Sequence, residues 1–414
     1  MYHRRNTCRC CGSGDLSLFL SLGPTPLANA FLKSEADYPG ELSFPLDLRF
    51  CNRCSLVQIC DIISPEVLFR DYIYVTGTSD TMALHNDAYA AEVFEVQSIQ
   101  PGDLVVEAAS NDGSLLSCFQ RRGSRTVGIE PARNIAEMAR ARGIETVSEF
   151  FDAGQANRIR ERFGPARSFI ANNVLAHVDD PAGFLSAAAS LLTDDGLAII
   201  ESPYIEGFAE GLEYDTVYHE HLSYFSAKAL MHLCERNGMI IMRFDLTPVH
   251  GGSFRMYAGK KSYYGQHSAQ ALDRAAAEDS AGYHSIAYWE NYAKRVWRNR
   301  ELLRALLGQL HEDGKSLAAY GAPAKGNTLL NYCQIGTDWI PYTVDRSPLK
   351  VGKLTPGMHL PVLPVETLLE RQPDYVLILP WNFASEIVRQ QAEYLRRGGQ
   401  FLLPLPDPGP LSIH

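Results

Sequence analysis

Residues 104–113 read LVVEAASNDG: a short apolar run reaches an acidic residue and passes through a turn into a helix-like segment. Three similar runs follow, TVGIEPA, SFIANNVLA and LAIIES, and they alternate with the helix-like segments NIAEMARARG and PAGFLSAAASLL. Repeated alternation of strand and helix is typical of a parallel sheet covered by helices. The stretch from 104 to 201 therefore predicts an α/β domain.

The loop after the first of these strands carries polar residues where a nucleotide-binding turn would carry glycines. Ligands of doubly wound sheets bind beyond the carboxyl ends of the strands. Residues 104–113 lack the G-x-G-x-x-G pattern of a pyrophosphate-binding turn, which disfavours a nicotinamide-dependent dehydrogenase. Glu107 suits a cationic ligand, such as the amino group and sulfonium of S-adenosylmethionine (SAM). Glu130, at the end of the next strand, can accept hydrogen bonds from both ribose hydroxyls.

These two carboxylates predict the cofactor site of a class I methyltransferase with a Rossmann-like core. The alternative is that both are ordinary carboxylates at strand ends. The residues assigned to SAM are Glu107, Ser110, Asn111, Asp112, Gly113, Glu130 and Asn172.

A row of polar, titratable side chains, Tyr218-His219-Glu220-His221, is a candidate for acid–base chemistry. His177 follows a strand-like run and is expected at the same sheet edge as Glu107. A histidine can remove a proton from a carbon beside a ketone, and a tyrosine or second histidine can donate to the resulting enolate oxygen. His219 and His221 should point in different directions. The alternatives are buried structural histidines, or a metal site that lacks an obvious third ligand.

Six of the nine cysteines lie in the first 60 residues. Cys8 and Cys11 form one C-x-x-C pair, and Cys51 and Cys54 form a second. Four thiolates satisfy the tetrahedral preference of Zn²⁺ and leave no open position, so one structural zinc is predicted. The alternatives are buried structural cysteines or a redox-active pair. Cys10 and Cys60 are expected to be spectators.

Length and charge limit the possible classes of protein. A chain of 414 residues usually folds into two or three domains. The net charge of −10 argues against nucleic acid as a main partner, and no apolar run is long enough for a membrane span. Polar residues interrupt the N-terminal segment where a signal peptide would be apolar. We expect a cytoplasmic monomer.

The chain resembles the C-methyltransferases that act on nucleotide-linked 4-keto-deoxysugars, and the resemblance covers nearly its whole length. The motifs that carry it are the four cysteines, Pro24–Phe31, Tyr74–Ser79, Ser110–Gly113, Tyr218–His221, His250–Ser253, Tyr320–Asn327 and Pro380–Asn382. The resemblance implies methyl transfer from SAM to the carbon beside the C4 ketone, usually C3, of a sugar linked to dTDP.

The same resemblance implies roles for individual residues. His221 falls on the position of the base that forms the enolate. Tyr218 and Glu220 look like groups that position the base or the substrate. Tyr72 and His177 match residues near the sugar and its keto oxygen.

One position departs from the family pattern. The family often has E-I-G-S-N-D-G, whereas Ala108 and Ala109 stand here in place of Ile and Gly. A Cβ atom at residue 109 restricts positive φ and close approach to a ligand. The departure concerns cofactor affinity and leaves the class of enzyme unchanged.

A second α/β series follows a long helical stretch at about 284–312. Its loop Tyr320–Asn327 (YGAPAKGN) has glycines that allow close backbone approach, and the next helix offers free N–H groups to an anion. By resemblance, this Rossmann-like unit holds the nucleotide of the substrate; the alternative is a remnant of a duplicated unit with a solvated lysine. The residues assigned to the substrate are Lys325, Asn327, Asp345, Trp381 and Asn382.

The predicted architecture has three parts: a zinc-binding domain at 1–66, a SAM-binding methyltransferase domain at 67–258 and a nucleotide-binding domain at 259–414. Methylation at C5, or of another keto substrate, is the first alternative function. A non-catalytic zinc-containing scaffold is the second, and the intact Tyr218, Glu220, His221 and His177 argue against it.

Overall fold

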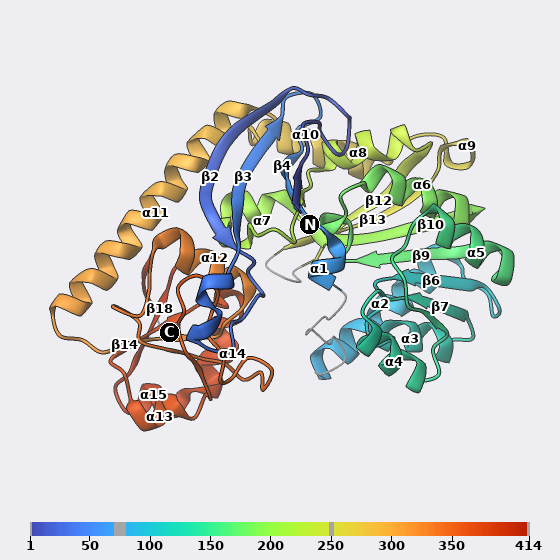
Figure 1. Cartoon of the computed structure of the whole chain (residues 1–414). Helices are drawn as coiled ribbons and strands as arrows, with labels where there is room; N and C mark the ends of the chain where they lie inside the picture. The colour runs from blue at the N-terminus through green and yellow to red at the C-terminus, as the bar shows by residue number, and fades with distance from the viewer. Residues whose placement is uncertain (1, 70–79, 248–251, 412–414) are drawn as a thin grey trace.

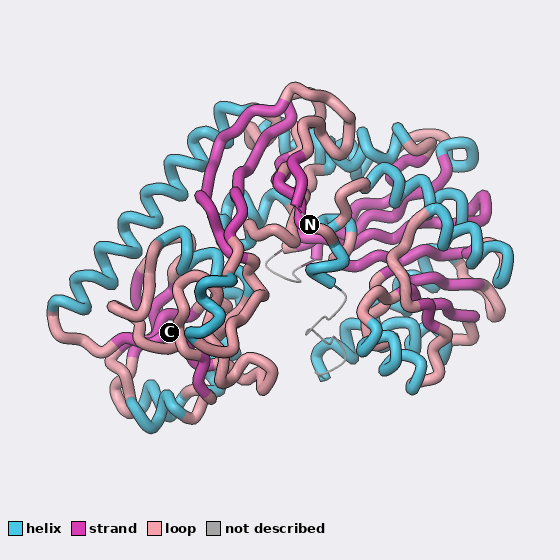
Figure 2. The backbone as a smooth tube through the Cα atoms, in the orientation of Figure 1, coloured by secondary structure: helices cyan, strands magenta, loops and turns pink. Residues whose placement is uncertain are grey.

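The computed structural model describes residues 2–69, 80–247 and 252–411, and it has three sheet-containing parts (Figure 1). The N-terminal strands β2, β3 and β4 stand between the central sheet and the long helix α11 (Ile286–Glu312), while the C-terminal sheet lies at the other end of that helix (Figures 1 and 2). Among the described residues, no helix is both long and apolar enough to cross a bilayer.

The central part is a seven-stranded sheet in the order β12-β13-β10-β9-β6-β7-β8. Strands β6 to β10 are parallel, and β13 runs antiparallel to both of its neighbours. The strands are β6 (Leu104–Ala108), β7 (Arg125–Ile129), β8 (Thr146–Val147), β9 (Ala166–Asn172), β10 (Leu192–Pro203), β12 (Met239–Thr247) and β13 (Ser253–Lys260). The four apolar runs of the sequence therefore form β6, β7, β9 and β10, as predicted.

Helices cover this sheet, and local signals in the sequence set where several of them begin. Asp152 and Asp180 accept hydrogen bonds from backbone amides at the starts of α5 and α6, and Pro181 occupies the first turn of α6. The helices of this part are α2 (Asp80–Gln97), α3 (Ser114–Arg121), α4 (Arg133–Ala141), α5 (Ala153–Phe163), α6 (Pro181–Leu191), α7 (Ile205–Glu210) and α8 (Ala227–Arg236), with the short 3₁₀ turns η3 (Leu175–His177) and η4 (Tyr214–Thr216).

The N-terminal part is a four-stranded sheet in the order β11-β4-β3-β2, together with the pair β1-β5. Its outer strand β11 comes from the central part of the chain and pairs antiparallel with β4. The bounds are β1 (Tyr2–Arg4), β2 (Leu16–Pro26), η1 (Glu35–Gly40), β3 (Ser43–Cys51), β4 (Val57–Ile59), β5 (Asp61–Ile63), α1 (Pro65–Phe69) and β11 (Ser223–Tyr224). The shared sheet joins the first two parts through backbone hydrogen bonds.

The C-terminal part has six strands in the order β16-β15-β14-β17-β18-β19, parallel except for β19. Two helices, α10 (Ala269–Ser280) and α11, precede it, and α9 (Lys261–Tyr264) follows β13. The remaining elements are β14 (Leu317–Tyr320), α12 (Ala324–Cys333), β15 (Thr343–Val344), β16 (Val362–Leu363), α13 (Thr367–Arg371), β17 (Tyr375–Ile378), η6 (Trp381–Phe383), α14 (Ala384–Gln390), α15 (Ala392–Arg396), β18 (Gln400–Leu403) and β19 (Gly409–Pro410).

One apolar core runs through all three parts. Trp289 of α11 is fully buried, and its ring centroid lies 5.6 Å from that of Phe19 and 6.0 Å from that of Phe208. These rings belong to the N-terminal, central and C-terminal segments of the chain. Because aromatic side chains bury large areas, this contact holds the parts in one arrangement.

Candidate active site

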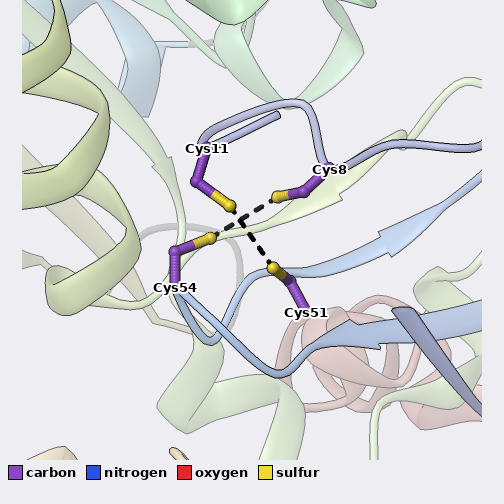
Figure 3. Close-up of side chains that lie close together, drawn as sticks. All are labelled: Cys8, Cys11, Cys51 and Cys54. Atoms are coloured by element: carbon purple, nitrogen blue, oxygen red, sulfur yellow. Dashed lines mark hydrogen bonds between the residues drawn. The ribbon is translucent and has the colours of Figure 1, made fainter. Parts of the chain in front are cut away.

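The four cysteines of the two C-x-x-C pairs meet in one cluster (Figure 3). Their sulfur atoms all lie within 4.8 Å of one another, and the Cys8–Cys54 and Cys11–Cys51 pairs are 3.4 Å and 3.5 Å apart. Hydrogen bonds within the cluster lower the pKa of Cys8 and raise the pKa of Cys54, so Cys8 is the sulfur that carries the thiolate, the form that ligates metal. Four convergent sulfurs are the donor set of a structural zinc.

The other two cysteines of this segment stay outside the cluster. Cys10 and Cys60 are buried, and burial raises the pKa of each thiol, which keeps it protonated. They lie apart from the four sulfurs of the cluster, and their role as spectators stays a prediction.

The zinc cluster is tied to the histidine motif through the backbone. Ile59 of β4 donates its amide hydrogen to the carbonyl of Leu222, at 3.1 Å, and β11 begins at the next residue. Arg9, between the first two cysteines, donates to the same carbonyl at 3.2 Å and to the carbonyl of Ile59. The residue directly after His221 is thus held from two sides by the N-terminal part.

A cavity of about 700 Å³ lies at the carboxyl edge of the central sheet. All three parts of the chain line it, from Pro65 of α1 to Phe383 of η6. The assigned residues that line it are Glu107, Ser110, Asn111, Glu130, Asn172, His177, Tyr218, His221, Lys325 and Asn382. Asp112, Gly113, Glu220, Asn327, Asp345 and Trp381 do not line it, and Tyr72 lies outside the described residues.

The SAM side of the cavity holds two buried carboxyl groups. Burial and the nearby Glu130 raise the pKa of Glu107 well above its usual value, and its Oε2 has no hydrogen-bond partner in the described chain. Glu130 accepts from the backbone amides of Asn111 at 2.9 Å and Ala132 at 2.8 Å. An orphaned acceptor at Glu107 fits the amino group of SAM, and the backbone bonds fix the direction of Glu130.

Asp112 and Gly113 shape the loop that follows β6. The carboxylate of Asp112 is fully buried and pairs with Arg142 at 2.8 Å, and it also accepts from the amide of Ser114. Gly113 has φ of 73°, and a Cβ there would lie 2.9 Å from Ile144. Asp112 and Gly113 therefore fix the conformation of the loop, although neither lines the cavity.

Ala109 adopts the conformation that the family's glycine would adopt freely. Its φ is 50°, in the left-handed region, which costs a non-glycine residue about 1–2 kcal/mol. Because glycine also costs about 0.4–1 kcal/mol through the unfolded chain, Ala109→Gly should leave stability unchanged or raise it by up to about 1.6 kcal/mol.

Denaturant unfolding checks this expectation, with Ala108→Gly as the matched control. Ala108 is buried in β6 with ordinary strand backbone, so its replacement should destabilise the protein by about 1 kcal/mol or more. Equal destabilisation by both variants would contradict the strain at residue 109.

His221 lines the cavity, and both of its ring nitrogens make hydrogen bonds within residues 216–221. Its Nδ1 lies 2.9 Å from the carbonyl of Thr216, so Nδ1 carries the proton and donates. Its Nε2 lies 2.7 Å from the hydroxyl of Tyr218, which donates to it. A histidine with Nδ1 fixed in this way has its basic lone pair on Nε2.

His177 carries its proton on Nδ1 in the same way as His221, and this limits it as a hydrogen-bond donor to the cavity. Its Nδ1 lies 2.6 Å from the carbonyl of Glu220 and must donate to it, and burial lowers its pKa to about 4. The neutral ring therefore has a bare Nε2, which accepts but does not donate. This geometry speaks against the expected role of His177 as a donor to an enolate oxygen. Its ring lies 4.8 Å from that of His221, in edge contact.

The other two members of the motif face the N-terminal part. His219 is buried, with Nε2 at 3.1 Å from the carbonyl of Pro45, so the prediction that His219 and His221 point apart is confirmed. Glu220 accepts from the side chain of Asn29 at 2.7 Å, and burial raises its pKa to about 7. Glu220 thus lies behind the cavity, in a position to orient the turn.

In the C-terminal part, the assigned residues divide between the cavity and the domain contacts. Lys325 lines the cavity; its Nζ donates to Asn382 and lies 4.0 Å from the ring centroid of Trp381. Asn327 donates to the carbonyl of Ala28 at 2.7 Å.

The two remaining side chains of this group also make internal bonds. Asp345 accepts from the amides of Ala322 and Ser347, and Trp381 donates to Asp215 at 2.7 Å. Their assigned contact with the substrate stays a prediction.

Sequence reasoning missed a buried ion pair at the floor of the cavity. Glu201, at the end of β10, lines the cavity and pairs with Arg255 at 2.7 Å. Arg255 lies over the ring of Tyr89, whose hydroxyl donates to Asn172. LAIIES ends with the same acidic signal as the strands of Glu107 and Glu130, so Glu201 could have been found; Arg9 and Asn29 carry no such signal.

The chain matches three family models. They are "Putative zinc binding domain" at residues 8–69, "Methyltransferase domain" at 84–241 and "C-methyltransferase C-terminal domain" at 248–406. The chain is also 37% identical to the C-methyltransferase NovU of Streptomyces niveus over 405 residues, which are 98% of this chain and 96% of that protein.

Two solved methyltransferases each overlap with less than half of the chain. Magnesium protoporphyrin IX methyltransferase of Synechocystis with bound SAM is 16% identical, with a TM-score of 0.33 over 43% of this chain and 79% of that one. A SAM-dependent methyltransferase of Clostridium acetobutylicum is 11% identical, with a TM-score of 0.36 over 44% of this chain and 93% of that one. The match to NovU covers nearly the whole of both chains, so this protein belongs to the family of SAM-dependent C-methyltransferases with an N-terminal zinc-binding domain.

Proposed function

We propose that the protein transfers a methyl group from SAM to the carbon beside the C4 ketone, at C3, of a nucleotide-linked 4-keto-deoxysugar. The observation that carries the proposal is that His221 lines the same cavity as Glu107 and Glu130. A base for carbon acids and the carboxylates expected to hold SAM therefore share one cavity. Bound SAM supplies an electrophilic methyl group on a positively charged sulfur.

In the proposed reaction, His221 removes the proton from the carbon beside the ketone. Its Nδ1–H stays on the carbonyl of Thr216, so the new proton goes to Nε2 and the resulting imidazolium keeps a hydrogen-bond acceptor. Tyr218, whose hydroxyl now donates to Nε2, can turn that hydrogen bond toward the keto oxygen as charge develops there. His177 supports the geometry through ring contact with His221.

The cofactor is proposed to lie along the carboxyl ends of β6 and β7. Glu107 faces its amino group and sulfonium side, and Glu130 accepts from the ribose hydroxyls. Glu130→Ala should therefore weaken SAM binding by about 1–3 kcal/mol, the range for hydrogen bonds to charged groups. Calorimetry measures this effect, and Glu137→Ala on the exposed face of α4 is the matched control. Unchanged affinity in Glu130→Ala would contradict the assignment.

The nucleotide is proposed to lie toward the start of α12. Pro323, Ala324 and Lys325 line the cavity there, and the first turn of a helix offers unpaired N–H groups to a diphosphate. Asn327 supports this loop by anchoring it to the carbonyl of Ala28. The protein is further proposed to act as a cytoplasmic monomer.

The deciding experiment is an assay of the wild-type protein with a panel of 4-keto sugar nucleotides and labelled SAM. We expect label on the sugar carbon next to the ketone, and NMR of the product distinguishes C3 from C5. Methylation at C5 would change the position but keep the chemistry, because C5 is also adjacent to a C4 ketone. Absence of transfer to every panel member, by a protein that binds SAM, would contradict the proposal.

A further inference from the structure

Glu213 is a cavity-lining carboxyl group without an assigned role. It lies in the loop between α7 and η4, and only 8% of its surface is exposed. No hydrogen bond to its carboxylate is found among the residues that the structure describes. Gly211 leaves room for it, since a Cβ there would lie 3.1 Å from Glu213 Oε1. A buried carboxylate that faces a cavity without a donor is suited to a donor on a ligand.

The charges around Glu213 favour such a donor over an anion. Burial and the nearby Asp215 raise the pKa of Glu213 to about 7, while the Lys325 ammonium lowers it, so both charged groups lie near Glu213. Lys325 lines the same cavity. The Lys325 ammonium already donates to Asn382, and Asp215 already accepts from Trp381. Two carboxyl groups against one ammonium leave no excess of positive charge, so a phosphate placed at Glu213 would be repelled.

The position of Glu213 relates it to the proposed base. The hydroxyl of Thr216 donates to the backbone carbonyl of Glu213 at 2.7 Å, and the carbonyl of Thr216 accepts from His221. Glu213 and His221 are therefore carried by one hydrogen-bonded turn. Lys325 brings the C-terminal loop to the same place, so Glu213 lies where the base and the proposed nucleotide site meet.

We propose that Glu213 determines substrate specificity by accepting a hydrogen bond from an O–H or N–H donor on the sugar of the substrate. This inference rests on the proposed function. A site built around a buried acceptor rejects analogues that lack the donor, because the acceptor is then left unpaired. A hydroxyl group and an ammonium group can both donate this hydrogen bond. The variants Glu213→Ala and Glu213→Gln distinguish the two donors.

The test compares Glu213→Ala and Glu213→Gln with wild type on 4-keto sugar nucleotides that carry either hydroxyl or amino substituents. For a hydroxyl donor, Glu213→Ala should raise KM about 10-fold or more while kcat changes little, and Glu213→Gln should keep most of the affinity because its amide oxygen still accepts. For an ammonium donor, both variants should raise KM about 10-fold or more, since the charge is lost in both.

Glu206→Gln is the matched control, because Glu206 lies on α7 outside the cavity and pairs with Arg274. SAM affinity and thermal stability are measured for every variant. If both Glu213 variants lower SAM affinity and stability along with substrate affinity, the role is structural and the inference is overturned. Unchanged KM for every substrate overturns it as well.

A binding measurement separates this inference from the proposed reaction. Calorimetry with S-adenosylhomocysteine present compares the sugar nucleotide with the free nucleoside diphosphate. Glu213→Ala should weaken the first about 10-fold and leave the second unchanged. A wild-type protein that binds the sugar nucleotides but methylates none would contradict the proposed function, while this comparison would still decide the role of Glu213.

Discussion

Replacing His221 with asparagine is expected to lower turnover by about 10²-fold or more while SAM and the sugar nucleotide still bind. Loss of a general base costs about 10²–10⁴-fold, and asparagine cannot accept a proton at neutral pH. The Nδ2 of asparagine can still donate to the carbonyl of Thr216, the bond that holds the ring of His221, so the fold of the turn should survive. Single-turnover kinetics and calorimetry measure the two effects separately.

Solvent deuterium exchange at the sugar carbon gives a second readout, because proton removal precedes methyl transfer in the proposed reaction. Exchange should vanish in His221→Asn and persist in His232→Asn, a matched control on α8 outside the cavity lining. Exchange at the wild-type rate in His221→Asn would move the role of base elsewhere. Tyr218 and Tyr72 would then be the next candidates, since the bare Nε2 of His177 belongs to a ring whose low pKa makes it a weak base.

The central fold could be predicted from the sequence because its signals are local. Four of the five parallel strands contain a short apolar run, and β6 and β7 are almost wholly buried, as their composition requires. The cysteine cluster was equally predictable, because two C-x-x-C pairs supply four sulfurs wherever the chain brings them together. Neither inference needed a contact between distant residues.

The shared sheet of the N-terminal and central parts could not be predicted in this way. β11 is two residues long, and its pairing with β4 joins residues more than 160 positions apart in the chain. So short a strand has no periodicity to detect. The same limit explains Arg9, whose buried side chain bonds to the carbonyl of Leu222 from an otherwise ordinary position between two zinc ligands.

The sequence could assign the polar residues of a motif to the site. It could not show which of their side chains line the cavity and which point away from it. Glu220 and His221 are neighbours, yet Glu220 bonds to Asn29 behind the cavity while His221 lines it. Asn327 and Lys325 differ similarly: the first anchors the loop to Ala28 and the second lines the cavity. The direction of a side chain depends on which distant backbone groups need a partner, and sequence spacing does not contain that information.

Removal of zinc is expected to destabilise the protein and to reduce turnover, although the metal is remote from the chemistry. Cys51→Ala breaks the cluster at the end of β3 and should reduce the metal content from about one zinc per chain to nearly none. Because structural zinc contributes about 10 kcal/mol to the folding of small zinc-dependent domains, a loss of about 5 kcal/mol or more in unfolding free energy is expected.

The effect on turnover follows from the position of β4. The turn from Cys51 to Cys54 leads directly into β4, and β4 holds the carbonyl of Leu222, the residue after His221. Loss of the metal should release this strand and with it the orientation of His221, so that kcat falls more than SAM affinity. Elemental analysis, thermal unfolding and single-turnover rates measure the loss of zinc, of stability and of turnover.

Cys60→Ala is the matched control, since Cys60 is buried in the same part but outside the cluster. A Cys51→Ala protein that keeps full zinc and stability would remove Cys51 from the ligand set, whereas one that loses zinc but keeps full turnover would uncouple the cluster from His221.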